Sequence, residues 1–110
     1  RKESLSARRR SIVAANRGSL LGDERRWNEA ADAFLLAIES EGFTEGTGVP
    51  LYLRARRAHA QAAAGPLSVA RFEEFERLHA ELRAQLGADN YYVKALDRLR
   101  DSPEFDLFRR

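Results

Sequence analysis

Apolar side chains recur every three or four residues along most of this chain, and no segment alternates apolar and polar residues as a strand does. The clearest stretch covers residues 24–40, where the apolar side chains fall on one continuous helical face. These side chains are Trp27, Ala30, Ala31, Phe34, Ala37 and Ile38. With 110 residues the chain has enough length for one core. The pattern predicts a single all-α domain over residues 1–110, built from about five helices.

Turn signals divide this domain into its helices. The first is expected to run from Ser4 or Ser6 to about residue 21, followed by helices over 24–40, 50–64 and 67–87 and a fifth one capped by Asp89 or Asn90. Gly22 is expected to break the first helix, and Asp23 to cap the second. The segment 41–50 is the one long loop. Because Pro103 suits a first helical position, a short helical segment is expected within 103–110.

Several classes of protein are excluded by what the chain lacks. It contains no cysteine, which excludes disulfides, thiolate metal sites and a cysteine nucleophile. No apolar run approaches the roughly 20 residues of a membrane helix, and no secretory signal follows the basic N-terminus. No phosphate-binding loop or catalytic elbow occurs, and His59 and His79 lack the spacing of a helical metal pair. We therefore expect a cytoplasmic protein with no membrane contact, metal, cofactor or enzymatic activity.

Charge alternates from helix to helix. The first and third predicted helices are basic and the second and fourth acidic, although 19 basic residues nearly balance 17 acidic ones overall. If consecutive helices are antiparallel neighbours, opposite charges face each other across each interface. Exposed ion pairs contribute only ~0–1 kcal/mol each. The charge pattern therefore biases the arrangement of helices more than it stabilises it.

The first two predicted helices resemble a tetratricopeptide (TPR) hairpin over about residues 12–41. The matching positions have the family's spacing of small and large side chains: Gly18, Leu21, Trp27, Ala30, Phe34 and Ala37. Gly18 and Ala30 would let the two backbones approach, while the larger side chains fill the wedge between them. Ala14 and Arg17 stand where the family has Trp and Leu, and Gly42 replaces its terminal proline.

This resemblance implies a protein-interaction module. In TPR-like units the first helix lines the binding surface, which would make Arg9, Asn16 and Arg17 contacts to an acidic peptide of a partner protein. A non-enzymatic adaptor or scaffold is therefore the preferred hypothesis.

A second hypothesis is a basic helical subunit that binds nucleic acid, for example in DNA packaging or RNA binding by a mobile element or defence system. Arginines cluster on two predicted helices, and they would form one basic face if those helices lie side by side. The arginines in question are Arg8, Arg9, Arg10, Arg17, Arg54, Arg56 and Arg57. No DNA-reading motif accompanies them, and the aromatic residues belong to the apolar stripes.

A third, remote hypothesis rests on the spacing of Arg54 and His59, which resembles the R-x4-H motif of the HEPN ribonucleases. In that family the histidine acts as acid or base on RNA, and the arginine stabilises the developing charge. The polar residue that often follows the arginine in that family is replaced here by Ala55.

Large apolar side chains on the fourth predicted helix outnumber what the alanine-rich third helix can cover. They are Phe72, Phe75, Leu78, Leu82 and Leu86. Either the C-terminal helix folds back over them or a second protomer does. Because a domain of this size leaves much of its surface uncovered, we predict a homo-oligomer, most simply a two-fold dimer through the fourth and fifth helices.

Overall fold

Five α-helices and one 3-10 turn make up the part of the chain that the structure describes, and no strand occurs there. The computed structural model describes residues 2–40, 48–65, 69–106 and 108, with the backbone alone for residues 2–6. The elements are α1 (Lys2–Asp23), α2 (Trp27–Glu39), α3 (Val49–Ala64), α4 (Val69–Leu86), α5 (Tyr91–Arg100) and η2 (Pro103–Phe105). The prediction of an all-α fold is confirmed. Ser4 and Ser6 lie inside α1 and do not begin it, and Ser68 lies outside the described residues.

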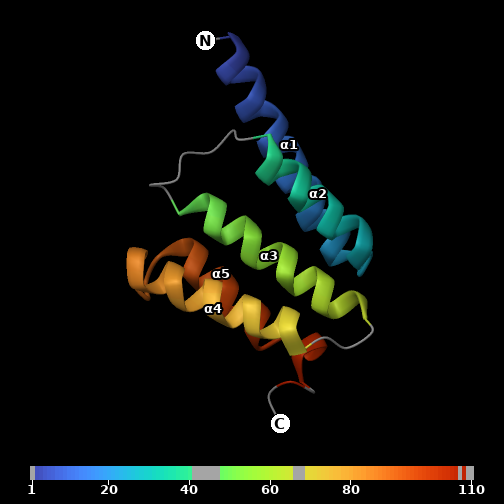
Figure 1. The fold of residues 1–110 in the computed structure, drawn as a ribbon, viewed down its shortest axis with the longest axis vertical. Helices are drawn as coiled ribbons and strands as arrows, with labels where there is room; N and C mark the ends of the chain where they lie inside the picture. The colour runs from blue at the N-terminus through green and yellow to red at the C-terminus, as the bar shows by residue number, and fades with distance from the viewer. Residues whose placement is uncertain (1, 41–47, 66–68, 107, 109–110) are drawn as a thin grey trace.

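The helices pack in chain order. Each of α1, α2 and α3 packs against the helix that follows it, and α5 covers the side of α3 and α4 that faces away from the viewer in Figure 1. At 22 residues α1 is much longer than α2 with 13, so its N-terminal turns extend beyond the rest of the domain (Figure 1). This arrangement alone does not identify a TPR.

The central helix α3 is buried on two sides. One side, including Ala55, Ala58 and Ala62, belongs to a core shared with α4, α5 and η2. The other side, with Leu53 and Ala60, belongs to a second core shared with α1 and α2. Small alanine side chains on α3 let its neighbours approach on both sides at once.

The turn between α1 and α2 differs from the sequence prediction. Gly22 does not break α1, and Asp23 is its last residue and not the cap of α2. The helix ends instead with Arg25 in the left-handed region at φ 61°. The Arg26 amide donates to the Leu21 carbonyl at 2.9 Å, and the Arg25 amide to the Gly22 carbonyl at 3.0 Å. This pair of bonds is a Schellman ending, which glycine usually supplies and Arg25 adopts at a conformational cost.

Other helix ends agree with the sequence. Of the two candidate caps for α5, Asn90 is the one used: its Oδ1 accepts from the amides of Tyr92 at 2.8 Å and Val93 at 3.4 Å. Gly87 ends α4 with φ 88°. The expected short helical segment near the C-terminus is the single turn η2.

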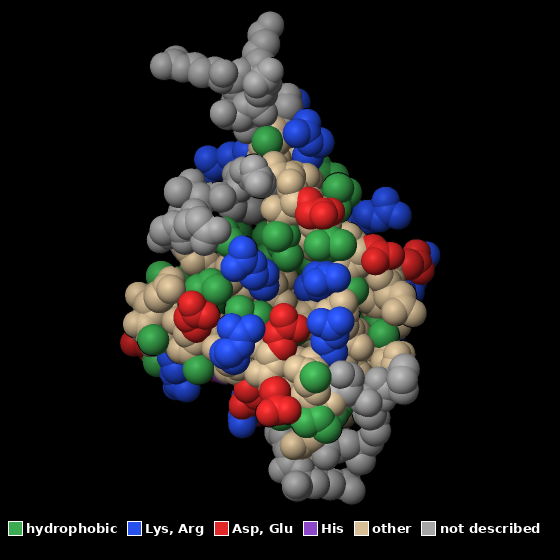
Figure 2. Space-filling model, in the orientation of Figure 1, with side chains coloured by type: hydrophobic (Ala, Val, Ile, Leu, Met, Phe, Trp, Pro, Cys, Tyr) green, Lys and Arg blue, Asp and Glu red, His purple; other side chains and the backbone are tan. Residues whose placement is uncertain are grey.

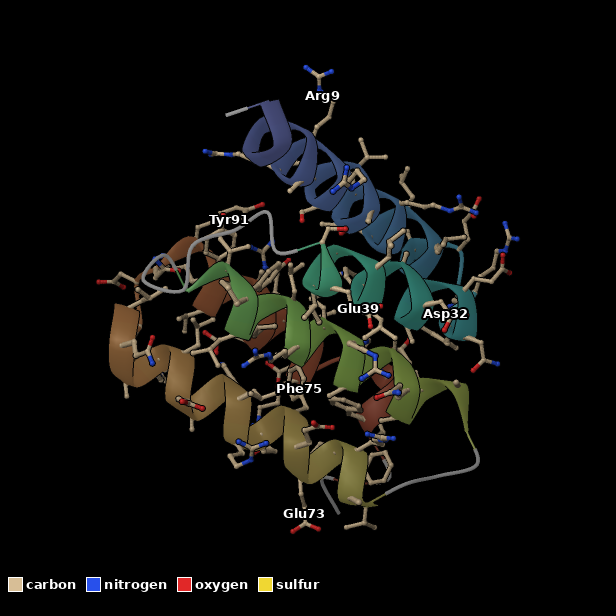
Figure 3. The ribbon with its side chains drawn as sticks, turned by 45° about the horizontal axis from the view of Figure 1, so that its top comes forward. Arg9, Asp32, Glu39, Glu73, Phe75 and Tyr91 are labelled. Atoms are coloured by element: carbon tan, nitrogen blue, oxygen red, sulfur yellow. The ribbon has the colours of Figure 1, made fainter. Side chains whose placement is uncertain are left out.

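The apolar seam of α4 is covered within one chain. Phe75, Leu78 and Leu82 are buried by α3, α5 and η2, with Phe72 and Leu86 packed partly against them. In Figure 3 the Phe75 side chain points from α4 toward α3, whereas Glu73 projects outward. Of the two arrangements left open by the sequence, the fold shows the C-terminal helix folded back on α4. The three buried residues therefore offer no surface to a second protomer in this conformation, and the association of chains stays a prediction.

Two glycines of α1 should respond to alanine in opposite ways. A Cβ added at Gly18 would lie 2.8 Å from Cε1 of the buried Phe34 ring, whereas one at Gly22 would come no closer than 3.8 Å to Arg56 or Trp27. We expect Gly18→Ala to destabilise the chain by about 1–3 kcal/mol through overpacking. Gly22→Ala should stabilise it by about 0.5–1 kcal/mol, because alanine loses less entropy in a helix. Urea unfolding measures both signs; two stabilising substitutions would show that α1 and α2 are not held at this separation.

Candidate functional site

A hollow between α1 and α2 combines arginines with apolar side chains. This hollow, the α1–α2 groove, has a volume of about 490 Å³. It is lined by Arg9, Arg10, Val13, Ala14, Arg17 and Leu36. Val13 and Leu36 are among the most exposed large apolar residues described, at 61% and 56% exposure. An apolar patch rimmed by polar groups is typical of an interaction surface.

The groove follows from the way α1 meets α2. Ser11 is fully buried and its hydroxyl donates to the Ala37 carbonyl at 3.0 Å, which fixes the rotation of α1 about its axis. Ala14, Gly18 and Leu21 continue this contact toward the end of the helix. With these residues turned inward, helical geometry places Val13 and Leu20 on the outer side. Leu20 is 64% exposed. The apolar residues Ile12, Val13 and Leu20 of α1 are therefore exposed, although their spacing resembles that of a buried stripe.

The rim of the groove carries uncompensated positive charge. Arg9, Arg10 and Arg17 are exposed, and none of them forms an ion pair with a residue that the structure describes. Figure 3 shows Arg9 extending away from the domain at the upper end of α1. The expected pairing of opposite charges between neighbouring helices is likewise missing between α1 and α2, α2 and α3, and α3 and α4 among the described side chains.

The groove contains two of the three residues predicted to bind a partner. Arg9 and Arg17 line it, whereas Asn16 is exposed on the same helix beyond its edge. The sequence reasoning missed Arg10, Val13 and Leu36 as members of this surface. A signal was present for Arg10, which is seven residues from Arg17 and so shares its face. Nothing in the sequence distinguishes an exposed Val13 or Leu36 from a core residue.

The arginines of the nucleic-acid hypothesis do not form one face. Helices α1 and α3 are not side by side, because α2 packs between them. Arg8 and Arg54 are exposed, Arg57 is half-buried, and Arg56 points into a different cavity. On the face seen in Figure 2, basic and acidic side chains are interspersed. A continuous basic face required α1 and α3 to lie side by side, and they do not.

A second cavity, the His59 pocket, lies where α1, α2, α3 and η2 meet. It has a volume of about 220 Å³. Its charged and aromatic lining consists of Asp23, Arg25, Trp27, Phe34, Arg56, His59 and Glu104. Residues that are far apart in the sequence meet there. Glu104 Oε1 lies 3.8 Å from Nη1 of Arg25, and Glu104 Oε2 lies 3.6 Å from Nε2 of His59. The sequence had assigned His59 to packing or solvent and gave no sign of this cluster.

The hydrogen bonds around His59 define which ring nitrogen carries a hydrogen, and its burial defines its charge. The Ser102 hydroxyl donates its proton to the Leu99 carbonyl at 2.6 Å. Its oxygen is 3.2 Å from Nε2 of His59, so it must accept there and Nε2 carries the hydrogen. Burial lowers the pKa of His59 to about 4, and the opposing attraction of Glu104 does not restore it. His59 is therefore a neutral donor at neutral pH.

The arrangement does not reproduce the R-x4-H pairing. Arg54 is exposed, whereas His59 is only 3% exposed and faces the pocket. Five residues along a helix turn two side chains well apart, so Arg54 and His59 do not converge in one chain. Arg56, three residues before His59, is the arginine that shares its cavity.

A third hollow, the α4–α5 groove, has a volume of about 790 Å³ and is lined mainly by charged residues. Four of its polar side chains are paired with one another: His79 Nε2 lies 2.7 Å from Asp97 Oδ1, and Arg100 Nε donates to Glu76 Oε1 at 2.6 Å. These two pairs each join α4 to α5. They explain why a histidine and an arginine stand in this groove without invoking a ligand.

The described residues contain neither a metal-binding group nor a helix suited to crossing a membrane. No group of three or more His, Asp or Glu side chains within them could hold a metal ion. None of the helices within them combines the length and the apolar character needed to cross a membrane. Comparison of the chain with protein-family models, curated proteins and solved structures gave no match. Function must therefore be inferred from the surfaces of the molecule.

Proposed function

We propose that this chain is a non-enzymatic protein-interaction module, and that the α1–α2 groove binds an acidic amphipathic helix of a partner protein. The observation that carries the proposal is the meeting, in one hollow, of exposed apolar side chains and three arginines that form no ion pair with a described residue. Four of the six lining residues, namely Val13, Ala14, Arg17 and Leu36, belong to the segment that resembles a TPR hairpin, and Arg9 and Arg10 precede it on the same helix.

The apolar part of the groove supplies the affinity in this proposal. Val13 and Leu36 come from different helices and leave a hollow between them, as in complexes where a helix lies in a groove. Covering such side chains removes apolar area from water, at roughly 25 cal/mol per Å². The neighbouring exposed Leu20 lies further along the same outer side of α1 and extends the apolar strip.

The arginines select the charge of the partner. Arg9, Arg10 and Arg17 surround the apolar floor, so a helix with leucines on one face and glutamates beside them would match both features. Charged rims of this kind act mainly on specificity and on the rate of association. Their contribution is expected to weaken as salt concentration rises.

Reversal of two rim charges should distinguish binding at this groove from nonspecific attraction between the peptide and a basic protein. The probe is a fluorescein-labelled peptide of about 18 residues with leucine and glutamate at helical spacing. We expect its affinity, measured by fluorescence anisotropy, to fall at least tenfold in Arg9→Glu/Arg17→Glu. The circular dichroism of the variant should be unchanged, because both side chains are exposed.

The matched control is Arg54→Glu/Arg57→Glu, which changes the net charge equally but on α3, and which should retain the affinity. A peptide with lysine in place of glutamate should not bind, nor should one with serine in place of leucine. Equal loss in both double variants would contradict the proposal. So would preferential binding of duplex DNA or RNA with a steep salt dependence, which is the mark of phosphate contacts.

A further inference from the structure

The His59 pocket has the size of a small-molecule site. Its volume of about 220 Å³ equals the space of roughly seven liquid waters. Sites for drug-sized ligands and nucleotide cofactors begin at about 300 Å³. The ligand that fits is therefore a compact molecule. Trp27 and Phe34 supply apolar wall, and Arg56 and Glu104 supply opposite charges.

The Arg56 guanidinium is placed by two contacts, and one of its donors has no hydrogen-bond partner among the described residues. Its Nη1 donates to the Tyr52 hydroxyl at 2.8 Å, and its guanidinium lies over the Phe34 ring at 5.0 Å from the centroid. Its Nε is buried and has no hydrogen-bond partner among the described residues. In a guanidinium with Nη1 on the side of Cδ, the Nε and Nη2 hydrogens point in parallel, which is the edge that pairs with a carboxylate through two bonds. A buried unpaired donor is costly, but Nε itself is closed to solvent. A ligand in the pocket would reach this edge through Nη2, which lies beside Gly22 of the lining.

The other charged residues of the pocket limit the charge that a ligand can carry besides its carboxylate. The lining contains two cations, Arg25 and Arg56, and two anions, Asp23 and Glu104. A ligand with only a negative charge would meet the repulsion of Glu104, whose side chain is 14% exposed. A ligand with one charge of each sign leaves the balance unchanged. His59 stays neutral and donates to Ser102, so it adds no third cation.

We propose that the His59 pocket binds a small zwitterion of the α-amino acid class, with its carboxylate on Nη2 of Arg56 and its ammonium group beside Glu104. The side chain of the ligand then lies along Trp27 and Phe34. This site is separate from the α1–α2 groove and does not depend on the proposed function.

Trp27 makes the proposal directly measurable, because it is the one tryptophan of the chain and lines the pocket. Glycine, alanine, leucine and phenylalanine would be titrated against its fluorescence at neutral pH. We expect at least one of them to give a saturable change. For leucine, the matched single-charge analogues are 4-methylpentanoate, without the ammonium group, and 3-methylbutylamine, without the carboxylate. Both should bind at least tenfold more weakly than the amino acid.

Two substitutions test which residue binds each charged group of the ligand, and a third serves as the control. Arg56→Lys keeps the cation but not the planar guanidinium that contacts Tyr52 and Phe34 and presents Nη2, and should weaken amino-acid binding at least tenfold. Glu104→Gln should weaken the amino acid and strengthen 4-methylpentanoate, a reversal that unfolding cannot produce. Arg54→Lys, on the exposed side of the same helix, should bind as the native chain does. Absence of a response to all four amino acids would overturn the proposal, as would equal binding of leucine and 4-methylpentanoate or unchanged binding by Arg56→Lys.

Discussion

Replacement of Phe105 by alanine is expected to destabilise the chain by about 3–5 kcal/mol, as large-to-small changes at buried aromatic positions do. Phe105 is fully buried although it belongs to a turn of only three residues. Its ring meets four others edge-on: His59 at 4.8 Å, Phe72 at 4.9 Å, Phe75 at 5.1 Å and Phe108 at 5.9 Å between centroids. Each such pair adds about 0.5–1.5 kcal/mol beyond the area it buries.

Thermal unfolding followed by circular dichroism measures this effect. A loss of about 3 kcal/mol corresponds to a fall in Tm of at least roughly 12 °C for a domain of this size. The control is Phe108→Ala, since Phe108 is half-buried and stacks on Phe72 at the edge of the same cluster; its cost should be nearer 1 kcal/mol. Equal and small losses in both variants would show that the end of the chain is not anchored on α3 and α4.

The sequence predicted the helices well because each has a clear apolar spacing and most have turn residues at their ends. Asn90 and Gly87 were recognised because amide caps and left-handed glycines act within a few residues. The end of α1 was mispredicted for the same local reason. Gly22 is tolerated inside the helix, and the turn falls three residues later at Arg25, where tertiary contacts impose a conformation that arginine does not favour.

The candidate sites depend on contacts between distant residues, and the sequence predicted them only in part. Arg9 and Arg17 could be placed on one outer surface from their spacing along α1. Leu36 could not, since its exposure depends on how α2 rotates against α1. The His59 pocket needs the turn after α1 and the segment after α5 to meet over α3. No local pattern records that Glu104 would lie beside residues some 45 and 79 positions earlier, namely His59 and Arg25.

Acidification below pH 6.5 should remove about 3 kcal/mol of stability through His59 alone. Burial against the aromatic cluster holds its pKa at about 4 in the folded chain, Glu104 opposes this, and the nearby Arg56 cation lowers it further. The unfolded imidazole titrates near 6.5. Between these two values the unfolded chain binds a proton that the folded chain does not. The contribution of His59 is therefore fully present above pH 6.5, is lost as the pH falls toward 4, and changes little below that.

His59→Gln isolates this dependence, because a glutamine amide can donate toward Ser102 Oγ but does not titrate. Urea unfolding of both proteins between pH 7 and pH 4 should show the difference in stability moving by about 3 kcal/mol in favour of the variant as the pH falls. Carboxylates titrate in both proteins and contribute little to that difference. If the His59 imidazole itself titrates near 6.5 by NMR in the folded chain, the prediction is contradicted, because protonated His59 is then stabilised by Glu104 as strongly as by water.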